Sequence, residues 1–419
     1  MRQNLRFLDL FAGAGGLSEG FIRAGFTPIA HVESDKAACY TLKTRIAYHW
    51  LKANDKQKVY TDYLENQIDR TELYGYVPKK QIDSVINQEI NEENLSSIFT
   101  KIDLQLGSRN LDLIIGGPPC QAYSIVGRSR DQNGMKGDKR NYLYRYYAEF
   151  LKRYKPKYFL FENVLGLLSA KDEEGKLYLD NMRSLFLENG YSTEYKILTA
   201  EDYGVLQKRK RIILVGFRGK KTEFYPEPEK WNPNLTVNEV FRDLPFIKAG
   251  EGHLGVCRTK KYTGQWLHQV GIKNEDIPVT MHQSRPNTQQ DLEIYKIAVE
   301  LWNKKQARLD YNSLPSRLKT HQNRSSFVDR FKVVASTLPC SHTIVAHIAK
   351  DGHYYIHPDI RQNRSLTPRE AARIQTFPDD YYFESSSGTP ARTPALKQIG
   401  NAVPVYLAEK IAITLKENW

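Results

Sequence analysis

The feature that most constrains the fold is an apolar segment followed by a glycine-rich turn and an amphipathic segment. Residues 5–11 (LRFLDLF) predict a strand, AGAGG predicts a tight turn, and residues 17–26 (LSEGFIRAGF) predict a helix. Helix and strand patterns keep alternating over the first two hundred residues, with further strands expected at 27–33, 84–90, 111–117, 157–164 and 211–217. This order predicts an α/β fold with a doubly wound, mostly parallel sheet whose ligands bind at the carboxyl ends of its strands.

The glycine turn indicates a nucleotide-like ligand. Its glycines are residues 13, 15, 16 and 20, so Ser18 stands where a GxGxxG dinucleotide fingerprint has its third glycine. Glu33 ends the next predicted strand about twenty residues later, where a carboxylate can accept hydrogen bonds from ribose hydroxyls. Together these residues favour an adenosine-containing cofactor without a pyrophosphate and disfavour a hydride-transfer cofactor.

Length and charge indicate two lobes and a polyanionic partner. The 419 residues exceed one ordinary domain, and the alternating pattern breaks after Gly219 in a stretch rich in proline and charge. The net charge is +13, and most of it lies in two segments: residues 205–330 hold 23 basic and 13 acidic side chains, and residues 122–145 hold 6 and 2. Basic charge confined in this way is typical of a nucleic-acid cleft, although a solvated basic surface would look the same.

A single cysteine, Cys120, follows the strand pattern LDLIIGGPP. A basic loop follows it and would favour the thiolate, so Cys120 is a candidate nucleophile, although an isolated cysteine is more often an inert buried thiol. Glu162 ends the predicted strand YFLFENV and is a candidate acid or base. Gln207, Arg209 and Arg211 alternate before and into a strand, so we expect their side chains to share one face.

Several classes of protein are disfavoured. The apolar runs are shorter than the ~20 residues of a membrane helix, and the first residues match a strand rather than a signal peptide, so we expect no membrane contact and a cytoplasmic location. The four cysteines are far apart and form no CxxC pair, which predicts free thiols and no metal site.

The ordered motifs FLDLFAGAGGLSEGF, GGPPCQAYS, FENV, QKRKR, RSLTPREAARIQTFPD and QIGNAVP resemble those of the DNA cytosine-5 methyltransferases. The resemblance spans the chain except a variable region. It implies a class I S-adenosylmethionine-dependent methyltransferase fold with a smaller, irregular target-recognition domain. We expect a catalytic and cofactor domain at 1–225, completed by the helix at 396–419, a target-recognition domain at 226–363, and a motif helix and hinge at 364–395.

The resemblance also implies a mechanism. Cys120 would attack C6 of a cytosine flipped out of double-stranded DNA, and C5 would then take the methyl group of S-adenosyl-L-methionine, leaving S-adenosyl-L-homocysteine. Glu162 would hold N3 and the exocyclic amine of the base, while Arg211 and Arg209 would fix O2 and the neighbouring loop. No metal takes part in this scheme.

The family match assigns the cofactor site as well. The residues implied are Phe11, Ala12, Gly13, Gly15, Gly16, Leu17, Glu33, Glu89, Pro118, Asn401 and Ala402. Two positions depart from the family pattern: Ser34 replaces a large stacking side chain, and Glu89 replaces the usual aspartate that receives the adenine amine. The stretch 52–81 matches no motif.

For DNA, the resemblance implies contacts from Ser124, Arg128, Arg130 and Gln207, with the loop 122–145 closing over the backbone. Arg369, Glu370 and Arg373 are expected to hold the target-recognition domain rather than to touch substrate. The partner is double-stranded DNA and the chain is expected to be a monomer. Its role would be to protect bacterial host DNA beside a cognate restriction endonuclease, a genetic rather than a physical partner.

Two alternatives remain open at this point. A tRNA cytosine-5 methyltransferase shares the fold, but that group carries a late Cys-Phe-Thr segment where this chain has PCSHTIV around Cys340. A catalytically silent DNA-binding repressor is the other, and intact Cys120, Glu162 and Arg211 argue against it.

Overall fold

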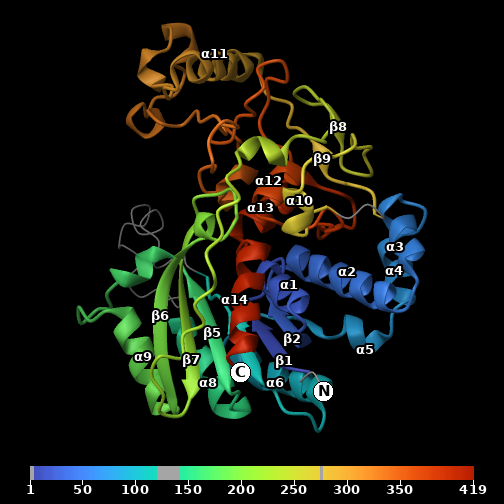
Figure 1. Ribbon diagram of the computed structural model, residues 1–419, viewed down its shortest axis with the longest axis vertical. Helices are drawn as coiled ribbons and strands as arrows, with labels where there is room; N and C mark the ends of the chain where they lie inside the picture. Colours follow the sequence, from blue (N-terminus) through green and yellow to red (C-terminus); the bar gives the residue numbers. More distant parts are fainter. Residues whose placement is uncertain (1–3, 120–141, 274–276) are drawn as a thin grey trace.

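The computed structural model describes residues 4–119, 142–273 and 277–419, and a seven-stranded sheet lies in its lower half (Figure 1). The sheet order is β3-β2-β1-β4-β5-β7-β6, and each neighbouring pair is parallel except those that involve β7. The predicted doubly wound, mostly parallel sheet is therefore confirmed. The strands are β1 (Arg6–Leu10), β2 (Thr27–Glu33), β3 (Val85–Asn87), β4 (Leu113–Gly116), β5 (Tyr158–Asn163), β6 (Tyr191–Thr199) and β7 (Lys210–Arg218).

Helices cover both faces of the sheet because alternate strand residues point to opposite sides. Phe7, Leu160 and Ile213 share one core with α1 and α14, whereas Leu8 and Phe159 share another with α6, α8 and α9. The helices of this part are α1 (Gly16–Arg23), α2 (Lys36–Ala53), α6 (Glu92–Leu106), α8 (Leu143–Tyr154), α9 (Tyr178–Glu188) and α14 (Val405–Glu417).

The last helix packs directly on the first. A Cβ added at Gly20 in α1 would lie 2.5 Å from the Cβ of Ala408 in α14, so only glycine permits this approach. As a result, the turn after β1 and the segment that precedes α14 are neighbours in space, although they are almost four hundred residues apart in sequence.

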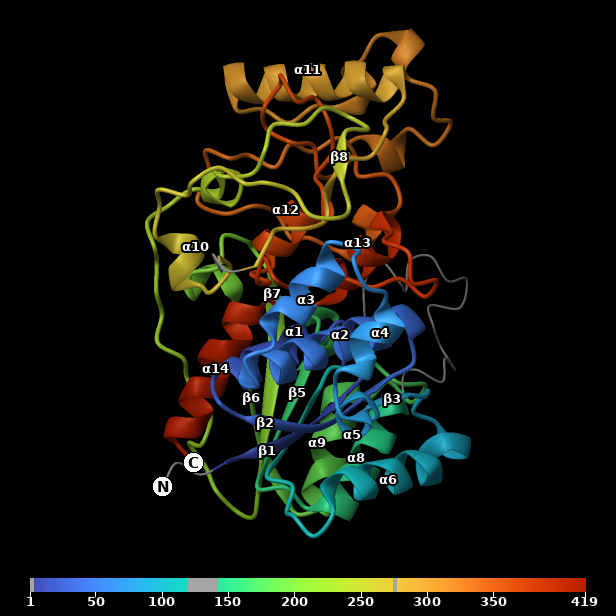
Figure 2. The same ribbon diagram turned by 90° about the vertical axis from the view of Figure 1, so that its right-hand side faces the viewer.

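The stretch 52–81, which the motifs left without interpretation, forms three short helices beside α2 (Figure 2). They are α3 (Gln57–Leu64), α4 (Arg70–Gly75) and α5 (Lys79–Ile82). Tyr60 donates a hydrogen bond to the carbonyl of Asp380 (2.7 Å), and Tyr63 donates one to Glu384 (2.5 Å). These helices are therefore anchored to the segment that follows the RSLTPREAARIQTFPD motif.

The upper part of the molecule has little regular structure and a small core of its own (Figure 1). That core includes Tyr295, Val299, Tyr311 and Phe331. The elements of the upper part are the two-stranded ribbon of β8 (Gly252–His253) and β9 (His282–Gln283) and the helices α10 (Trp266–Gln269) and α11 (Gln289–Lys305).

Two helices lie between the upper part and the sheet, namely α12 (Pro368–Ile374) and α13 (Arg392–Asn401). Thr367 caps α12 by accepting a hydrogen bond from the backbone N–H of Glu370, and the helix ends at Ile374. Buried Arg373 joins Asp243 of the upper part to Asp379 through ion pairs of 2.5 and 2.6 Å. The motif helix thus holds together segments from different parts of the chain.

Candidate active site

A cavity of about 1130 Å³ opens at the carboxyl ends of the central strands, where the fold predicts a ligand. This volume is sufficient for a cofactor together with part of a second ligand, since small-molecule sites measure roughly 300–1000 Å³. Of the predicted site residues, its walls contain Phe11, Ala12, Gly13, Gly16, Leu17, Glu33, Glu89, Pro118, Glu162, Arg211, Asn401 and Ala402.

The turn after β1 forms one wall of the cavity and needs its glycines. Gly13 has a φ of 54°, a left-handed conformation that favours glycine, and no atom lies within 4 Å of where its Cβ would be. A Cβ on Gly16 would meet the carbonyl of Val403 at 2.5 Å. Gly15 faces away from the cavity, against Leu42 and Tyr381, so its role is in packing rather than at the cavity surface.

Glu33 is held rigidly at the end of β2. Its Oε2 accepts the backbone N–H of Gly13 (2.8 Å), and its Oε1 accepts those of Ser34 (2.8 Å) and Asp35 (2.7 Å). A carboxylate offers about four acceptor positions. Oε2 therefore keeps one for a ligand, and the turn and the carboxylate are fixed relative to each other.

Asp9 in β1 was missed by the sequence analysis. Burial, and then the charge of Glu33, raise the pKa of Asp9 well above its usual value. Its Oδ2 is buried and has no hydrogen-bond partner within the described ranges, and the residue lines the cavity. The signal in the sequence was an acidic residue inside an otherwise apolar strand, which is a costly placement unless a ligand compensates it.

Glu162 and Arg211 contact each other in the same cavity. The Nε of Arg211 lies 2.6 Å from the Oε1 of Glu162, and both side chains are largely buried, with exposed fractions of 12% and 15%. They come from β5 and β7, which are antiparallel neighbours. A Cβ on Gly117 would lie 2.5 Å from the Oε2 of Glu162, which explains why glycine precedes the two prolines here.

Gln207 and Arg209 do not share this position with Arg211. Gln207 is fully buried, accepts the N–H of Ile344 (2.8 Å) and donates to the side chain of Gln375 (3.0 Å). Arg209, 1% exposed, donates to the carbonyl of Ile344 (2.6 Å). Burial alternates along this stretch, since Lys208 and Lys210 are exposed, but Gln207 and Arg209 are buried in the contact between the upper part and the sheet and only Arg211 lines the cavity.

Some predicted residues cannot be placed. Cys120, Ser124, Arg128 and Arg130 lie outside the described residues. Pro119, which directly precedes Cys120, lines the cavity near Glu162.

In residues 4–119, 142–273 and 277–419, no group of three His, Cys, Asp or Glu side chains could hold a metal ion. Cys39, Cys257 and Cys340 are free thiols. None of the helices in these ranges is both long and apolar enough to cross a membrane.

A mostly parallel sheet with a glycine turn, a ribose-type carboxylate and a Glu–Arg pair in one cavity defines a methyltransferase of the class I fold. The family model of C-5 cytosine-specific DNA methylases matches residues 5–417, so the chain belongs to this family. It is a DNA cytosine-5 methyltransferase, and its family implies DNA as substrate and a methyl donor of the S-adenosylmethionine type.

The relatives agree with this assignment. The type II methyltransferase M.Bpa9945I of Bacillus paralicheniformis is 42% identical over 98% of both chains. M.DdeI of Desulfomicrobium norvegicum is 30% identical over 97% of this chain and 88% of its own. Among solved structures, the methyltransferase EhMeth of Entamoeba histolytica has the same fold, with a TM-score of 0.54 at 15% identity over 99% of this chain and 98% of its own.

Proposed function

We propose that this enzyme methylates C5 of a cytosine flipped out of double-stranded DNA, through a covalent bond between Cys120 and C6. The observation that supports it best is the Glu162–Arg211 pair, which lies in the same cavity as the cofactor turn. C5 of cytosine is a poor nucleophile. Addition of the Cys120 thiolate to C6 makes C5 electron-rich, so that C5 can attack a methyl group.

Glu162 and Arg211 are suited to hold the ring during this step. A carboxyl group can hydrogen-bond N3 and the exocyclic amine of cytosine, and a guanidinium can donate to O2. Because the two side chains contact each other at 2.6 Å, they present donors and acceptors side by side to one edge of a base. After methyl transfer, loss of the C5 proton restores the ring and releases the thiolate.

The remaining cavity residues fit the cofactor. S-Adenosyl-L-methionine supplies an electrophilic methyl group and is converted to S-adenosyl-L-homocysteine. Glu33 offers its free acceptor position to a ribose hydroxyl, and Glu89 is the candidate acceptor for the adenine amine. The open space beside Gly13 and the unpartnered Oδ2 of Asp9, judged over the described residues, are consistent with a polar ligand at this wall. Asn401 and Ala402 would approach the methionine part.

The names of the relatives support a proposal for the biological role. Both curated relatives named above are type II methyltransferases. We therefore infer that this chain works as a monomer in the bacterial cytoplasm and protects host DNA at the site of a cognate restriction endonuclease. Within the chain, we assign the cofactor to residues 1–225 and 396–419 and base recognition to 226–363.

The covalent step can be tested with 5-fluorocytosine. Bisulfite sequencing of DNA from cells that express the protein gives the recognition sequence, and a duplex with that sequence carries 5-fluorocytosine at the target. With S-adenosyl-L-methionine we expect an adduct that survives denaturation, because fluorine cannot leave as the C5 proton does. Cys120→Ser should give none. Methylation without any trapped adduct would contradict the covalent route, and reaction with structured RNA in place of duplex DNA would contradict the substrate.

A further inference from the structure

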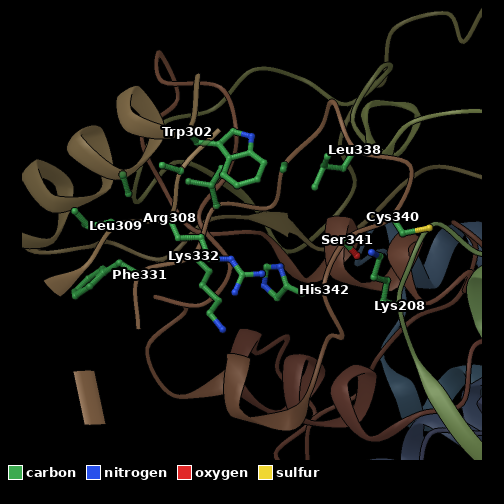
Figure 3. A pocket seen from close by; sticks show the side chains of 14 residues that line it. Lys208, Trp302, Arg308, Leu309, Phe331, Lys332, Leu338, Cys340, Ser341 and His342 are labelled. Carbon is green, nitrogen blue, oxygen red and sulfur yellow. The ribbon is translucent and has the colours of Figure 1, made fainter. Parts of the chain in front are cut away.

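A second, smaller pocket of about 110 Å³ lies between the upper part and the segment that leads into β7 (Figure 3). Lys208, Arg308 and Lys332 line it together with Trp302 and Ser341, and its lining contains no carboxylate. In Figure 3, Trp302 and Arg308 are drawn on one side of this pocket, and Lys208 and Ser341 on the other. The cations therefore come from three separate segments of the chain.

The pocket is connected to the active site through a short backbone path. The N–H of Lys208 donates to the carbonyl of Ser341 (2.9 Å), and the N–H of Ser341 donates to the carbonyl of Leu206 (3.0 Å). Lys208 is three residues before Arg211. Three residues span at most about 10 Å, and one DNA strand rises about 3.4 Å per nucleotide, so the backbone of Lys208 lies within about three nucleotides of Arg211.

The positive charge of the pocket is incompletely neutralised. Asp329, which is not part of the lining, pairs with both Lys332 (2.5 Å) and Arg308 (3.8 Å). Two cations thus share one carboxylate. Burial, and then the nearby carboxylates of Glu201 and Asp202, raise the pKa of the Cys340 thiol in the lining, but Asp202 pairs with Lys230 (3.2 Å), and no ion pair joins Lys208 to a carboxylate of the described residues. The pocket is accordingly suited to an anion.

An unused hydrogen-bonding group provides a second, independent observation. Ser341 is 2% exposed and lines the pocket, yet its Oγ has no hydrogen-bond partner in the described part of the chain. Buried hydroxyl groups are normally paired, because leaving one unpaired destabilises the folded state. An anionic oxygen placed in the pocket would accept the hydrogen bond that Ser341 can donate.

We propose that this pocket binds a backbone phosphate of the DNA substrate, within about three nucleotides of the target cytosine. Ser341 donates a hydrogen bond to a phosphate oxygen, while Lys208, Arg308 and Lys332 supply the charge. Trp302 forms an apolar wall against the adjoining sugar. The inference rests on DNA being the substrate and adds the position of one contact and the residues that make it.

Salt dependence tests the charge. We would compare wild type, the double variant Arg308→Gln/Lys332→Gln, and the control Lys304→Gln/Lys305→Gln, which removes two exposed cations at the end of α11, outside the pocket. One lost phosphate contact lowers the slope of log affinity against log salt by about 0.9. When the salt is raised from 50 to 200 mM, duplex binding weakens for both proteins. The factor by which it weakens should be about 3.5 times smaller for the pocket variant than for wild type. An unchanged slope, or an equal change in the control, would overturn the proposal.

Ser341→Ala separates binding from folding. The backbone hydrogen bonds of Ser341 remain in this variant, so we expect its Tm to be no lower than that of wild type while duplex affinity falls severalfold. A fall in Tm with unchanged affinity would show a structural role only and would refute the phosphate contact.

Single methylphosphonates, which are uncharged, then locate the phosphate. Placed one at a time in a duplex that contains the recognition sequence, one of them should weaken binding by wild type but not by the pocket variant. Equal profiles for both proteins would refute the site. Methylation of the unmodified duplex by wild type is measured in the same samples. If that duplex is not methylated, the proposed function is wrong. If it is methylated normally but the two binding profiles are equal, only the proposal for this pocket is wrong.

Discussion

Replacing Arg373 by methionine should destabilise the enzyme without touching its cavity. The side chain is fully buried and donates two hydrogen bonds to Asp379 (2.8 and 2.6 Å), two to Asp243 (2.5 and 3.2 Å) and one to the carbonyl of Val240 (3.1 Å). Methionine fills a similar volume but pairs with neither carboxylate. Removing one member of a buried ion pair costs about 3–5 kcal/mol, because the partner charge stays buried.

The lower end of this range applies here, since both carboxylates keep a second cation. Lys273 remains 2.7 Å from Asp243, and Arg369 remains 3.9 Å from Asp379. With an unfolding entropy of about 2.1 cal/mol/K per residue, a chain of 419 residues that unfolds as one unit loses about 1 °C of Tm per kcal/mol. A loss of about 3 kcal/mol therefore predicts a Tm about 3 °C lower.

The pH dependence of the Tm difference between wild type and Arg373→Met tests whether the loss of ion pairs to buried carboxylates causes the destabilisation. Burial alone would raise the pKa of Asp243, but the hydrogen bonds and charges of Arg373 and Lys273 outweigh it and lower the pKa below its usual value. A lowered carboxyl pKa stabilises the fold above the unfolded pKa of about 3.9, and this contribution is lost as the pH falls through the folded pKa. The difference in Tm between wild type and variant should thus be full at pH 7 and shrink below about pH 5.

Differential scanning calorimetry across this pH range measures the effect. Lys58→Met is the matched control, because Lys58 pairs with Asp62 at an exposed position and its loss should leave Tm unchanged. A Tm difference for Arg373→Met that is below about 1 °C at pH 7, or that grows on acidification, would refute the reasoning.

Three further changes probe the cavity. Arg211→Lys keeps the charge but not the planar fork, so kcat in a steady-state methylation assay should fall about 100-fold with little change in Tm; a wild-type kcat would exclude Arg211 from the reaction. Glu33→Gln should raise the KM for S-adenosyl-L-methionine about tenfold and leave the KM for DNA unchanged, as measured by varying each substrate. An equal rise in both KM values would mean general damage. Gly16→Ala places a methyl group 2.5 Å from the carbonyl of Val403 and should lower stability by about 1–3 kcal/mol in urea titration, whereas a neutral result would mean that the turn can move.

The sheet and most of the cavity could be predicted from the sequence because the relevant signals are local. The strand β1 and the turn after it follow from an apolar run and the glycines, and Glu33 follows from its distance to that turn. The carboxyl ends of parallel strands meet at one edge, so the position of Glu162 at the end of its predicted strand favours the same edge as the turn. By contrast, β6 was missed, since it is an edge strand whose middle residues are exposed and whose apolar alternation is weak.

Contacts between distant segments could not be predicted in this way. The strand spacing predicted that Gln207, Arg209 and Arg211 share one face, but it carries no information on what packs against Gln207 and Arg209, which are buried and do not line the cavity. The stretch 52–81 could not be interpreted either, because Tyr60 and Tyr63 form their hydrogen bonds with residues more than three hundred positions later in the sequence. Asp9 was overlooked for another reason: its surroundings are apolar in sequence, and only the fold shows that it faces a cavity.

Buried amides connect the upper part to the cofactor wall, which explains why polar residues of the QKRKR motif lie in the interior. Gln207 accepts the N–H of Ile344 and donates to the Oε1 of Gln375, whose own Nε2 donates to the carbonyls of Ile399 (2.9 Å) and Ala402 (3.3 Å). Each amide acts as donor and acceptor at once, so no apolar residue of the same size could keep the carbonyls paired. This series of hydrogen bonds begins at Ile344, which is close in sequence to Ser341 of the proposed phosphate pocket. It ends at Ala402, which lines the proposed cofactor cavity. The region proposed to read DNA is therefore fixed to the region proposed to hold the cofactor, and Arg211, four residues beyond Gln207, is fixed between them.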